Sequence, residues 1–302
     1  SIPGVRTGTL SRVKGTSDPG AKAKDLVNLS IANVVSSDDC GTSRGVSINT
    51  SDVDLESRYL SEKVVAGSKV YNKNTLVDPE VMKYLRKYHK GVNVRSPLTC
   101  KAMHGVCKKC AGNTEKGKPY ERGENAGILS AQSLSEPLTQ MAMNAFHTGG
   151  SASGKGAAVG DHFEHLARLM SATKNVKGEA QIAPEGGNIT AIRENKELGG
   201  DDILVNDIPI HIPEGKEILV KLGQKVKAGA PLTNGPINLH KLLDSAGMEV
   251  TRKYMLEQMH LVYGEYGVRR RHIEMLLKNL TGVLEVETDD EIEFAPGDRI
   301  TK

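Results

Sequence analysis

The chain has 302 residues and a formal net charge of +3, a length that accommodates two or more modules with a sizeable core. The small net charge does not by itself indicate nucleic-acid binding, and the presence of only 3 Phe and 0 Trp predicts a core dispersed among small modules. No apolar run approaches the roughly 18 residues of a membrane span, and no signal peptide is visible. A chain without a membrane span and with several small modules is therefore expected.

The first predicted element is a helix. Residues 1–20 are basic and contain several glycines, whereas Ala21 to Val35 carry apolar residues at a spacing that fits a buried helix better than a strand. The turn sequence of residues 38–42, Asp-Asp-Cys-Gly-Thr, ends it. Asp18-Pro19-Gly20 is a poor helix sequence, so a kinked helix is the alternative to a regular one.

Short strands and one helix follow. Val46–Asn49 and Lys63–Ala66 have strand-like patterns, and Pro79–His89 is predicted to be a short helix with its apolar residues on one side. The chain then leads back towards a cluster of cysteines.

The only cysteines in the sequence are Cys40, Cys100, Cys107 and Cys110. The CxxC spacing of the last two lets both thiolates turn onto one ion, and four thiolates match the closed tetrahedral site of structural Zn²⁺. Two disulfides, or two unrelated buried thiols beside a redox CxxC pair, are the alternatives, but no secretory signal supports disulfides and no thioredoxin-like elements flank the CxxC. The spacing predicts one zinc ion held by the four cysteines. His104 lies between two ligands and is left out, because four cysteines already suffice.

A long stretch from Asn125 to Gly150 is predicted to form two helical pieces. The Glu-Pro pair at 136–137 interrupts the first piece, and the second extends from Leu138 to a pair of glycines. Residues four apart share one face of the second piece, and these are Thr139, Met143 and His147. A core helix followed by a surface loop is the simpler interpretation, whereas a helix tipped with histidine and followed by a glycine-rich loop indicates a functional element.

Beyond Gly150, a flexible loop is predicted for Ser151–Gly160. Asp161 is a plausible N-cap for an amphipathic helix that covers His162–Thr173, with apolar residues on one face.

Residues 175–238 are predicted to form a small β module, and the chain after Asn238 is predicted to be mostly helical. The strand-like pieces are Glu179–Ala183, Asn188–Ile192, Ile203–Val205 and Ile208–Ile212. The helical pieces are Leu239–Ala246, Glu249–Tyr266 and Arg271–Leu280, and a strand-rich, acidic ending covers Val283–Lys302. The basic cluster Arg269-Arg270-Arg271 is either a solvated turn or a contact with phosphate or a partner subunit.

Several stretches resemble one family. The sequence Gly123-Glu-Asn-Ala-Gly-Ile-Leu-Ser-Ala-Gln-Ser-Leu-Ser-Glu-Pro-Leu-Thr-Gln140, followed by Met143 and Phe146-His147-Thr148-Gly149-Gly150, resembles the trigger-loop segment of the largest, beta-prime-type subunit of multisubunit DNA-directed RNA polymerases. Residues 4–42 resemble the bridge helix of that subunit and the segment after it, and the four cysteines resemble its second zinc site. Glu217 to Thr233 has the pattern of a hammerhead turn in a barrel-sandwich module, and residues 249–280 resemble its late helices.

The resemblance implies an α+β fold of several modules. Most of the bridge helix would occupy residues 1–37, a zinc-binding module 38–122, and the trigger helices with their loop 123–175. A β-rich barrel-sandwich module would follow at 176–238, and C-terminal helices with ending strands at 239–302.

The resemblance also implies a role in template-directed RNA synthesis, in which the bridge helix and trigger loop close on the incoming NTP. His147 would lie against the β-phosphate as a cation, a hydrogen-bond donor or a general acid, because histidine titrates near neutral pH. Met143 would pack on the base or sugar, with Gln140 and Asn144 as polar neighbours. The family usually has Arg where Asn144 stands, so another subunit or Lys155 is expected to compensate.

Nucleotide addition needs Mg²⁺ ions held by closely placed carboxylates. Asp38-Asp39 and Asp289-Asp290-Glu291 lack the Asp-x-Asp-x-Asp pattern of the family's metal loop, and Asp38-Asp39 is more simply a cap or turn. The catalytic Mg²⁺ is therefore expected on a partner polypeptide, and this chain is expected to be inactive alone.

The partners that the resemblance implies are a beta-type subunit, an N-terminal beta-prime-type subunit, the DNA template, the RNA transcript and NTPs, all in the cytoplasm. The missing metal loop favours a split subunit, as in certain large phages or plastid-type enzymes. The divergence of the sequence from ordinary bacterial ones favours a phage, whose enzyme would act in the host cytoplasm. The alternative function is a non-catalytic, zinc-stapled structural or nucleic-acid-binding module of the same fold.

Overall fold

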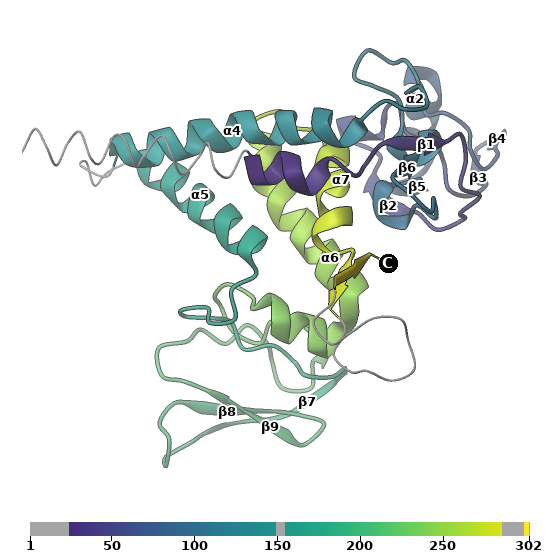
Figure 1. Ribbon diagram of the computed structural model, residues 1–302. Helices are drawn as coiled ribbons and strands as arrows, with labels where there is room; N and C mark the ends of the chain where they lie inside the picture. The colour runs from purple at the N-terminus through teal and green to yellow at the C-terminus, as the bar shows by residue number, and fades with distance from the viewer. Residues whose placement is uncertain (1–23, 149–154, 286–298, 302) are drawn as a thin grey trace, which may run out of the picture. The chain divides into compact units, whose positions relative to one another are not determined.

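The computed structural model describes residues 24–148, 155–285 and 299–301. They form a mixed α and β structure, in agreement with the predicted fold class, and divide into two compact units (Figure 1). The first unit contains the chain up to Phe163 and from Gln258 onward, and the second contains Glu164–Glu257. In the described part of the chain, every helix is too short or too polar to cross a membrane.

The helix predicted for Ala21–Val35 is described from residue 24 and ends at residue 30, so its predicted end is wrong. Val35–Ser37 form strand β1, which pairs in parallel with β6 (Val106–Cys107). The β-branched side chains at positions 34 and 35 favour the extended backbone, and the partner strand supplies its hydrogen bonds. Residues 1–23 of the predicted bridge segment lie outside the described residues.

A module of short strands follows β1. Strands β2 (Val46–Asn49) and β5 (Gly91–Val94) form one antiparallel ribbon, and β3 (Val64–Ala66) and β4 (Lys69–Tyr71) form another. Two 3₁₀ turns, η1 (Val53–Leu55) and η2 (Pro97–Thr99), and one helix, α2 (Pro79–Tyr88), complete it. The predictions of β2, β3 and α2 are confirmed.

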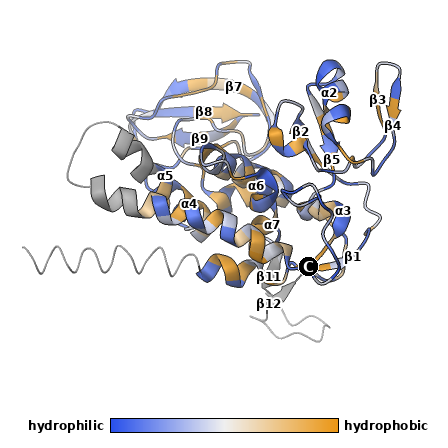
Figure 2. Ribbon diagram, turned by 90° about the horizontal axis from the view of Figure 1, so that it is seen from above, coloured by the Kyte–Doolittle hydropathy of each residue, from blue (hydrophilic) through white to orange (hydrophobic). Residues whose placement is uncertain are grey.

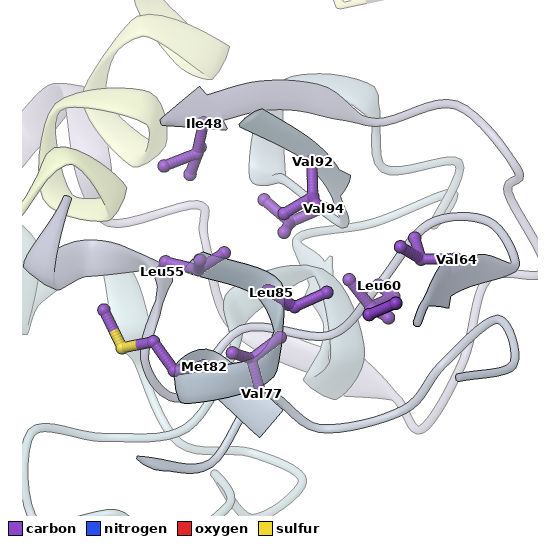
Figure 3. Packing of buried hydrophobic residues seen from close by; sticks show 10 residues of the cluster. Ile48, Leu55, Leu60, Val64, Val77, Met82, Leu85, Val92 and Val94 are labelled. Atoms are coloured by element: carbon purple, nitrogen blue, oxygen red, sulfur yellow. The ribbon is translucent and has the colours of Figure 1, made fainter. Parts of the chain in front are cut away.

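The core of this module lies between α2 and the ribbons (Figure 3). Asp78 caps α2 by accepting a hydrogen bond from the Val81 backbone N–H at 2.8 Å. Met82 and Leu85 are the buried residues of α2, which is otherwise largely hydrophilic (Figure 2). The buried core consists of Ile48, Leu55, Leu60, Val64, Ala66, Val77, Met82, Leu85, Val92 and Val94.

A single helix, α4 (Ala126–Thr148), occupies the stretch that was expected to form two helical pieces. The predicted interruption at Pro137 is wrong, since this proline lies inside the helix and is buried. An interior proline costs a helix about 3 kcal/mol. Leu134, Leu138 and Met141 are each 0% exposed, and burial of each such side chain contributes about 1.5–3 kcal/mol, so tertiary packing outweighs the local cost.

Helix α5 (Lys155–Ser171) begins earlier than predicted. Asp161 lies within the helix and is not its N-cap, and residues 155–160 are helical although a loop was expected there. Residues 149–154, the remainder of the predicted loop, lie outside the described residues.

The second unit contains an antiparallel sheet with the strand order β10-β7-β8-β9. Its strands are β7 (Gly187–Glu194), β8 (Asp201–Val205), β9 (Ile208–Ile212) and β10 (Lys225–Val226). Three of the four predicted strands are confirmed. Glu179–Ala183 is not a strand, because it bonds to irregular backbone at residues 230–233 and forms only an isolated bridge between Ile182 and Pro231.

The C-terminal helices follow the predicted pattern. Helix α6 (Leu239–Glu265) is broken at Gly247, whose φ of +79° is non-helical, so the two predicted helical pieces are confirmed. Helix α7 (Arg270–Leu280) follows. Strands β11 (Val283–Glu285) and β12 (Arg299–Thr301) pair antiparallel, as expected of a strand-rich ending.

Helix α7 buries two charges that residues far away in the sequence compensate. Glu274 Oε1 accepts a hydrogen bond from Arg58 Nη2 at 2.6 Å, and both side chains are 0% exposed. Arg271 Nε donates to Asp54 Oδ1 at 2.7 Å, and Arg58 lies 3.1 Å from the other Asp54 oxygen. Burial alone would raise the pKa of Asp54, but the charges of Arg58 and Arg271 outweigh it and hold this pKa below its usual value. The four charges form a balanced buried network.

We expect Glu274→Gln to lower the free energy of unfolding by about 3–5 kcal/mol, because it leaves Arg58 buried without its closest carboxylate. The matched control is Glu80→Gln, which removes a carboxylate of an exposed pair with Lys69 and should change stability by less than about 1 kcal/mol. Urea unfolding monitored by circular dichroism measures both. Equal small effects would show that the buried network does not stabilise the fold.

Candidate metal centre

Four short elements bring the cysteines together. Cys40 follows β1, Cys100 follows η2, and Cys107 ends β6. Cys110 lies in the short helix α3 (Lys108–Ala111), whose N-cap is Cys107. Because β1 and β6 pair in parallel, with Ser37 opposite Cys107, the strand pairing carries Cys40 towards the CxxC turn.

The ligand atoms of the four cysteines all lie within 4.8 Å of one another. The Sγ atoms of Cys40 and Cys110 are 3.7 Å apart, which is too long for a disulfide bond of about 2.05 Å, and all four thiols are free. Tetrahedral Zn–S bonds of about 2.3 Å place two ligand sulfurs about 3.8 Å apart. The alternatives of two disulfides and of unrelated thiols are therefore wrong.

Backbone N–H groups point at three of the sulfurs. Cys40 Sγ accepts from Lys101 at 3.2 Å, and Cys100 Sγ and Cys107 Sγ accept from residues 107 and 110, each at 3.4 Å. The sulfurs also compete for negative charge: hydrogen bonding to Cys107 raises the pKa of Cys100 to about 11, and hydrogen bonding to Cys100 raises that of Cys110. A divalent cation bound between the sulfurs would offset the repulsion between neighbouring thiolates. The cluster can therefore hold a metal ion and is consistent with zinc.

The neighbouring carboxylates are engaged in ion pairs. Asp38 pairs with Lys108 at 3.0 Å and with Arg122 at 2.5 Å, and the hydrogen bond from Lys108 contributes most to holding its pKa below the usual value. Asp39 accepts from the Gly41 backbone N–H at 2.9 Å, the turn role expected for this pair. Among the residues that the structure describes, the four cysteines are the one converging group of potential metal ligands.

Gln140 is the one member of the predicted nucleotide-facing group whose side chain falls within the described residues. It is exposed on α4 and lines a cavity of about 240 Å³ together with Glu115, Glu136 and His272. Burial, with the nearby Arg271 charge, lowers the pKa of His272, whose Nδ1 lies 3.0 Å from the Ser130 hydroxyl. This shift favours the neutral imidazole.

The side chains of Met143, Asn144 and His147 lie outside the described residues, although the backbone of α4 is helical through Thr148. The helical spacing that puts Met143 and His147 on the face of Thr139 therefore holds for the backbone. Their roles stay predictions.

The structure corrects the interpretation of one of the three clustered arginines and adds residues that the sequence did not single out. Arg271 is neither solvated nor free for phosphate, because it is buried against Asp54 and the Asn113 carbonyl, at 2.6 Å from the latter. Arg95 and Arg58 are fully buried and were not expected at all. The one signal for Arg95 is its position directly after the apolar strand β5 and five residues before a cysteine.

Comparison with known proteins defines the family. A family model described as RNA polymerase Rpb1, domain 5, matches residues 4–221. The chain belongs to the RNA polymerase Rpb1 domain 5 family.

Curated relatives of this Rpb1 domain 5 chain are DNA-directed RNA polymerase beta' subunits. Those of Moorella thermoacetica and Heliobacterium modesticaldum are each 33% identical over 98% of the chain, and that of Finegoldia magna is 34% identical over 98%. The chain spans 27%, 27% and 26% of the lengths of these relatives. The resemblance to part of a beta-prime-type subunit is thereby confirmed.

We expect the purified chain to bind one divalent ion through the four cysteines. Cobalt(II) should give the visible bands of a tetrahedral thiolate site, and Cys110→Ser should weaken binding and alter those bands. His104 lies in the same loop, is exposed and is not a ligand, so His104→Ala should bind as wild type does. Absorbance titration measures all three proteins. Loss of the bands in His104→Ala, or octahedral bands in wild type, would contradict the four-sulfur assignment.

Proposed function

We propose that this chain is the part of a DNA-directed RNA polymerase subunit that carries the bridge helix and the trigger loop, and that the trigger helix closes on the incoming NTP. The observation that carries the proposal is the family match over residues 4–221, which spans residues 24–30, the four cysteines, α4 and α5. The proposed modules are the bridge helix at 1–37, the zinc module at 38–122 and the trigger helices at 123–175. The barrel-sandwich module at 176–238 and the C-terminal helices at 239–302 would support them.

Hydrogen bonds inside the first unit support a coupling between the proposed bridge and trigger segments. The Val35 N–H donates to the Glu124 carbonyl, and the Gly123 N–H donates to the Val35 carbonyl, both at 2.9 Å. On the other side, the Val106 N–H donates to the Val34 carbonyl at 3.0 Å. Residues 34 and 35 are thus bonded both to the strand that ends in Cys107 and to the residues that precede α4. An ion held by the cysteines would therefore stabilise the base from which the proposed trigger helix extends.

We infer that the ion is zinc. Four thiolates form a soft, closed donor set, which suits a structural Zn²⁺ and leaves no open coordination position for substrate. The ion would stabilise the fold of the module, and metal analysis of the purified chain should identify one zinc ion per chain.

In the proposed mechanism, α4 presents one face to the nucleotide. The four-residue spacing of Met143 and His147 supports a base or sugar contact one turn before a phosphate contact. His147 would stabilise charge on the β-phosphate or donate a proton to the leaving group, since an imidazole titrates near neutral pH. Gln140 and Asn144 would supply polar contacts, and Lys155 or another subunit would replace the arginine that the family usually has at position 144.

The catalytic Mg²⁺ would be held elsewhere in the polymerase. The described residues offer no converging carboxylate cluster, and the sequence lacks the Asp-x-Asp-x-Asp pattern, so the chain does not fit this ion by itself. The proposed partners are a beta-type subunit, the N-terminal beta-prime-type segment, the DNA template, the RNA transcript and NTPs, in the cytoplasm. A split subunit of a large phage stays a prediction.

The first prediction from this proposal is that the 302-residue chain alone shows no nucleotidyl transfer, because it lacks the carboxylates that hold the catalytic Mg²⁺. Extension of a primed template with radiolabelled NTP measures this, with the assembled polymerase as the positive control. RNA synthesis by the isolated chain would refute the assignment of the metal loop to a partner.

The second prediction concerns His147 in the assembled enzyme. His147→Ala should slow single-nucleotide addition at saturating NTP by roughly 10²–10⁴-fold, about 3–5 kcal/mol of barrier, with nucleic-acid binding nearly unchanged. His147→Gln should lose less if positioning dominates and about as much if proton donation dominates. Rapid-quench kinetics supplies the rates.

The matched control for this experiment is His104→Ala, the same change at an exposed histidine outside α4, which should leave the rate unchanged. A His147→Ala rate within about twofold of wild type, against the loss expected of a catalytic group, would reject the trigger role. The chain would then be a non-catalytic, zinc-stapled module of the same family.

A further inference from the structure

A buried guanidinium lies against the sulfurs of the metal centre. Arg95 follows β5 directly, and its side chain is 0% exposed. Its Nη2 lies 3.3 Å from Cys40 Sγ and 3.6 Å from Cys107 Sγ, and its Nε lies 3.4 Å from Cys110 Sγ. One side chain therefore offers hydrogen bonds to three of the four cysteines.

Cys110 depends on Arg95 for a hydrogen-bond donor more than the other three cysteines do. Cys40, Cys100 and Cys107 each accept a backbone N–H. Within the described ranges, the one N–H donor to Cys110 Sγ is Arg95 Nε. Arg95 thus occupies the place that a backbone amide takes at the other three sulfurs.

The orientation of the guanidinium is fixed by groups that are not ligands. Arg95 Nη1 donates to Asn74 Oδ1 and Nη2 donates to Asp39 Oδ1, each at 2.7 Å. A planar guanidinium with both edges engaged cannot rotate away from the sulfurs. The donor geometry is therefore set by the module and does not require the ion.

The positive charge of Arg95 offsets negative charge at the metal centre. Four thiolates around one divalent ion leave two excess negative charges in a site where Cys107 and Cys110 are buried and Cys40 and Cys100 are partly buried. An arginine stays protonated under all ordinary conditions, so it neutralises part of this charge. Hydrogen bonds to thiolate sulfurs also make the bound form more favourable, as partners of metal ligands generally do.

We propose that Arg95 is a positioning residue of the metal centre, which orients Cys40, Cys107 and Cys110 and balances their charge. The inference rests on the proposed zinc site and adds a residue that is not a ligand.

The test measures zinc affinity of the full chain by competition with a chromogenic chelator. Arg95→Gln should bind zinc roughly 10–100-fold more weakly than wild type, the usual loss for a partner of metal ligands. The matched control is Arg86→Gln in the same module, since Arg86 is exposed and donates its Nε to the Thr50 carbonyl, away from the sulfurs. Its affinity should equal that of wild type.

A cobalt(II) spectrum separates positioning from a purely structural role. If Arg95 orients the sulfurs, the thiolate-to-cobalt band of Arg95→Gln should shift even when the site is saturated and the circular dichroism is that of the wild type. A folded Arg95→Gln protein with wild-type affinity and an unshifted band would overturn the inference. If Arg95→Gln does not fold in saturating zinc, Arg95→Lys decides: a measurable loss of affinity supports the inference, and wild-type affinity overturns it.

The outcomes distinguish this inference from the proposal on which it rests. Failure of the wild-type chain to bind zinc would reject the zinc site itself. Tight zinc binding by wild type and by Arg95→Gln alike would reject only the role of Arg95.

Discussion

The backbone of residues 33–37 is hydrogen-bonded along both edges, and the rest of the first unit is arranged around this double pairing. On one edge it meets the strand that ends in Cys107, and on the other it meets the residues that lead into α4. The first approach depends on glycine, and so does the contact between the start of α4 and the helix that ends at residue 30. A Cβ at Gly105 would lie 1.9 Å from the Val34 carbonyl oxygen, and one at Gly127 would lie 1.9 Å from that of Ser30, so no other residue fits without moving the backbone.

Helix α7 closes this arrangement from the C-terminal end of the chain. Its Met275 carbonyl accepts a hydrogen bond from the Asn33 side chain at 3.0 Å, and its Lys278 ammonium donates to the Gly105 carbonyl. The buried pairs of Arg271 with Asp54 and of Glu274 with Arg58 join the same helix to the strand module. The four-cysteine cluster, the end of a helix and the start of α4 are thereby held by one set of contacts, which would give the proposed trigger helix a rigid base.

The sequence was most informative where chemistry is local. The cysteine spacing led to the four-sulfur cluster, and the apolar pattern after Pro79 led to α2, which starts at that residue. The sequence was misleading where contacts between residues far apart in the chain determine the local structure. Pro137 breaks a helix by local rules, but burial of its neighbours keeps α4 continuous, and Val35 prefers a strand because Val106 is there to pair with it. Arg58 and Glu274 lie 216 positions apart, and charged residues normally indicate the surface, so no local pattern predicts their burial.

The central claim is that this chain works as one piece of a multisubunit polymerase, and purification of the chain from its native cell with everything bound to it tests that claim most directly. The account predicts that mass spectrometry identifies a beta-type polypeptide and one that carries the Asp-x-Asp-x-Asp loop, and that the purified complex extends RNA on a primed template. Recovery of the folded, metal-bearing chain without any polymerase polypeptide, or with partners that do not extend RNA, would contradict it.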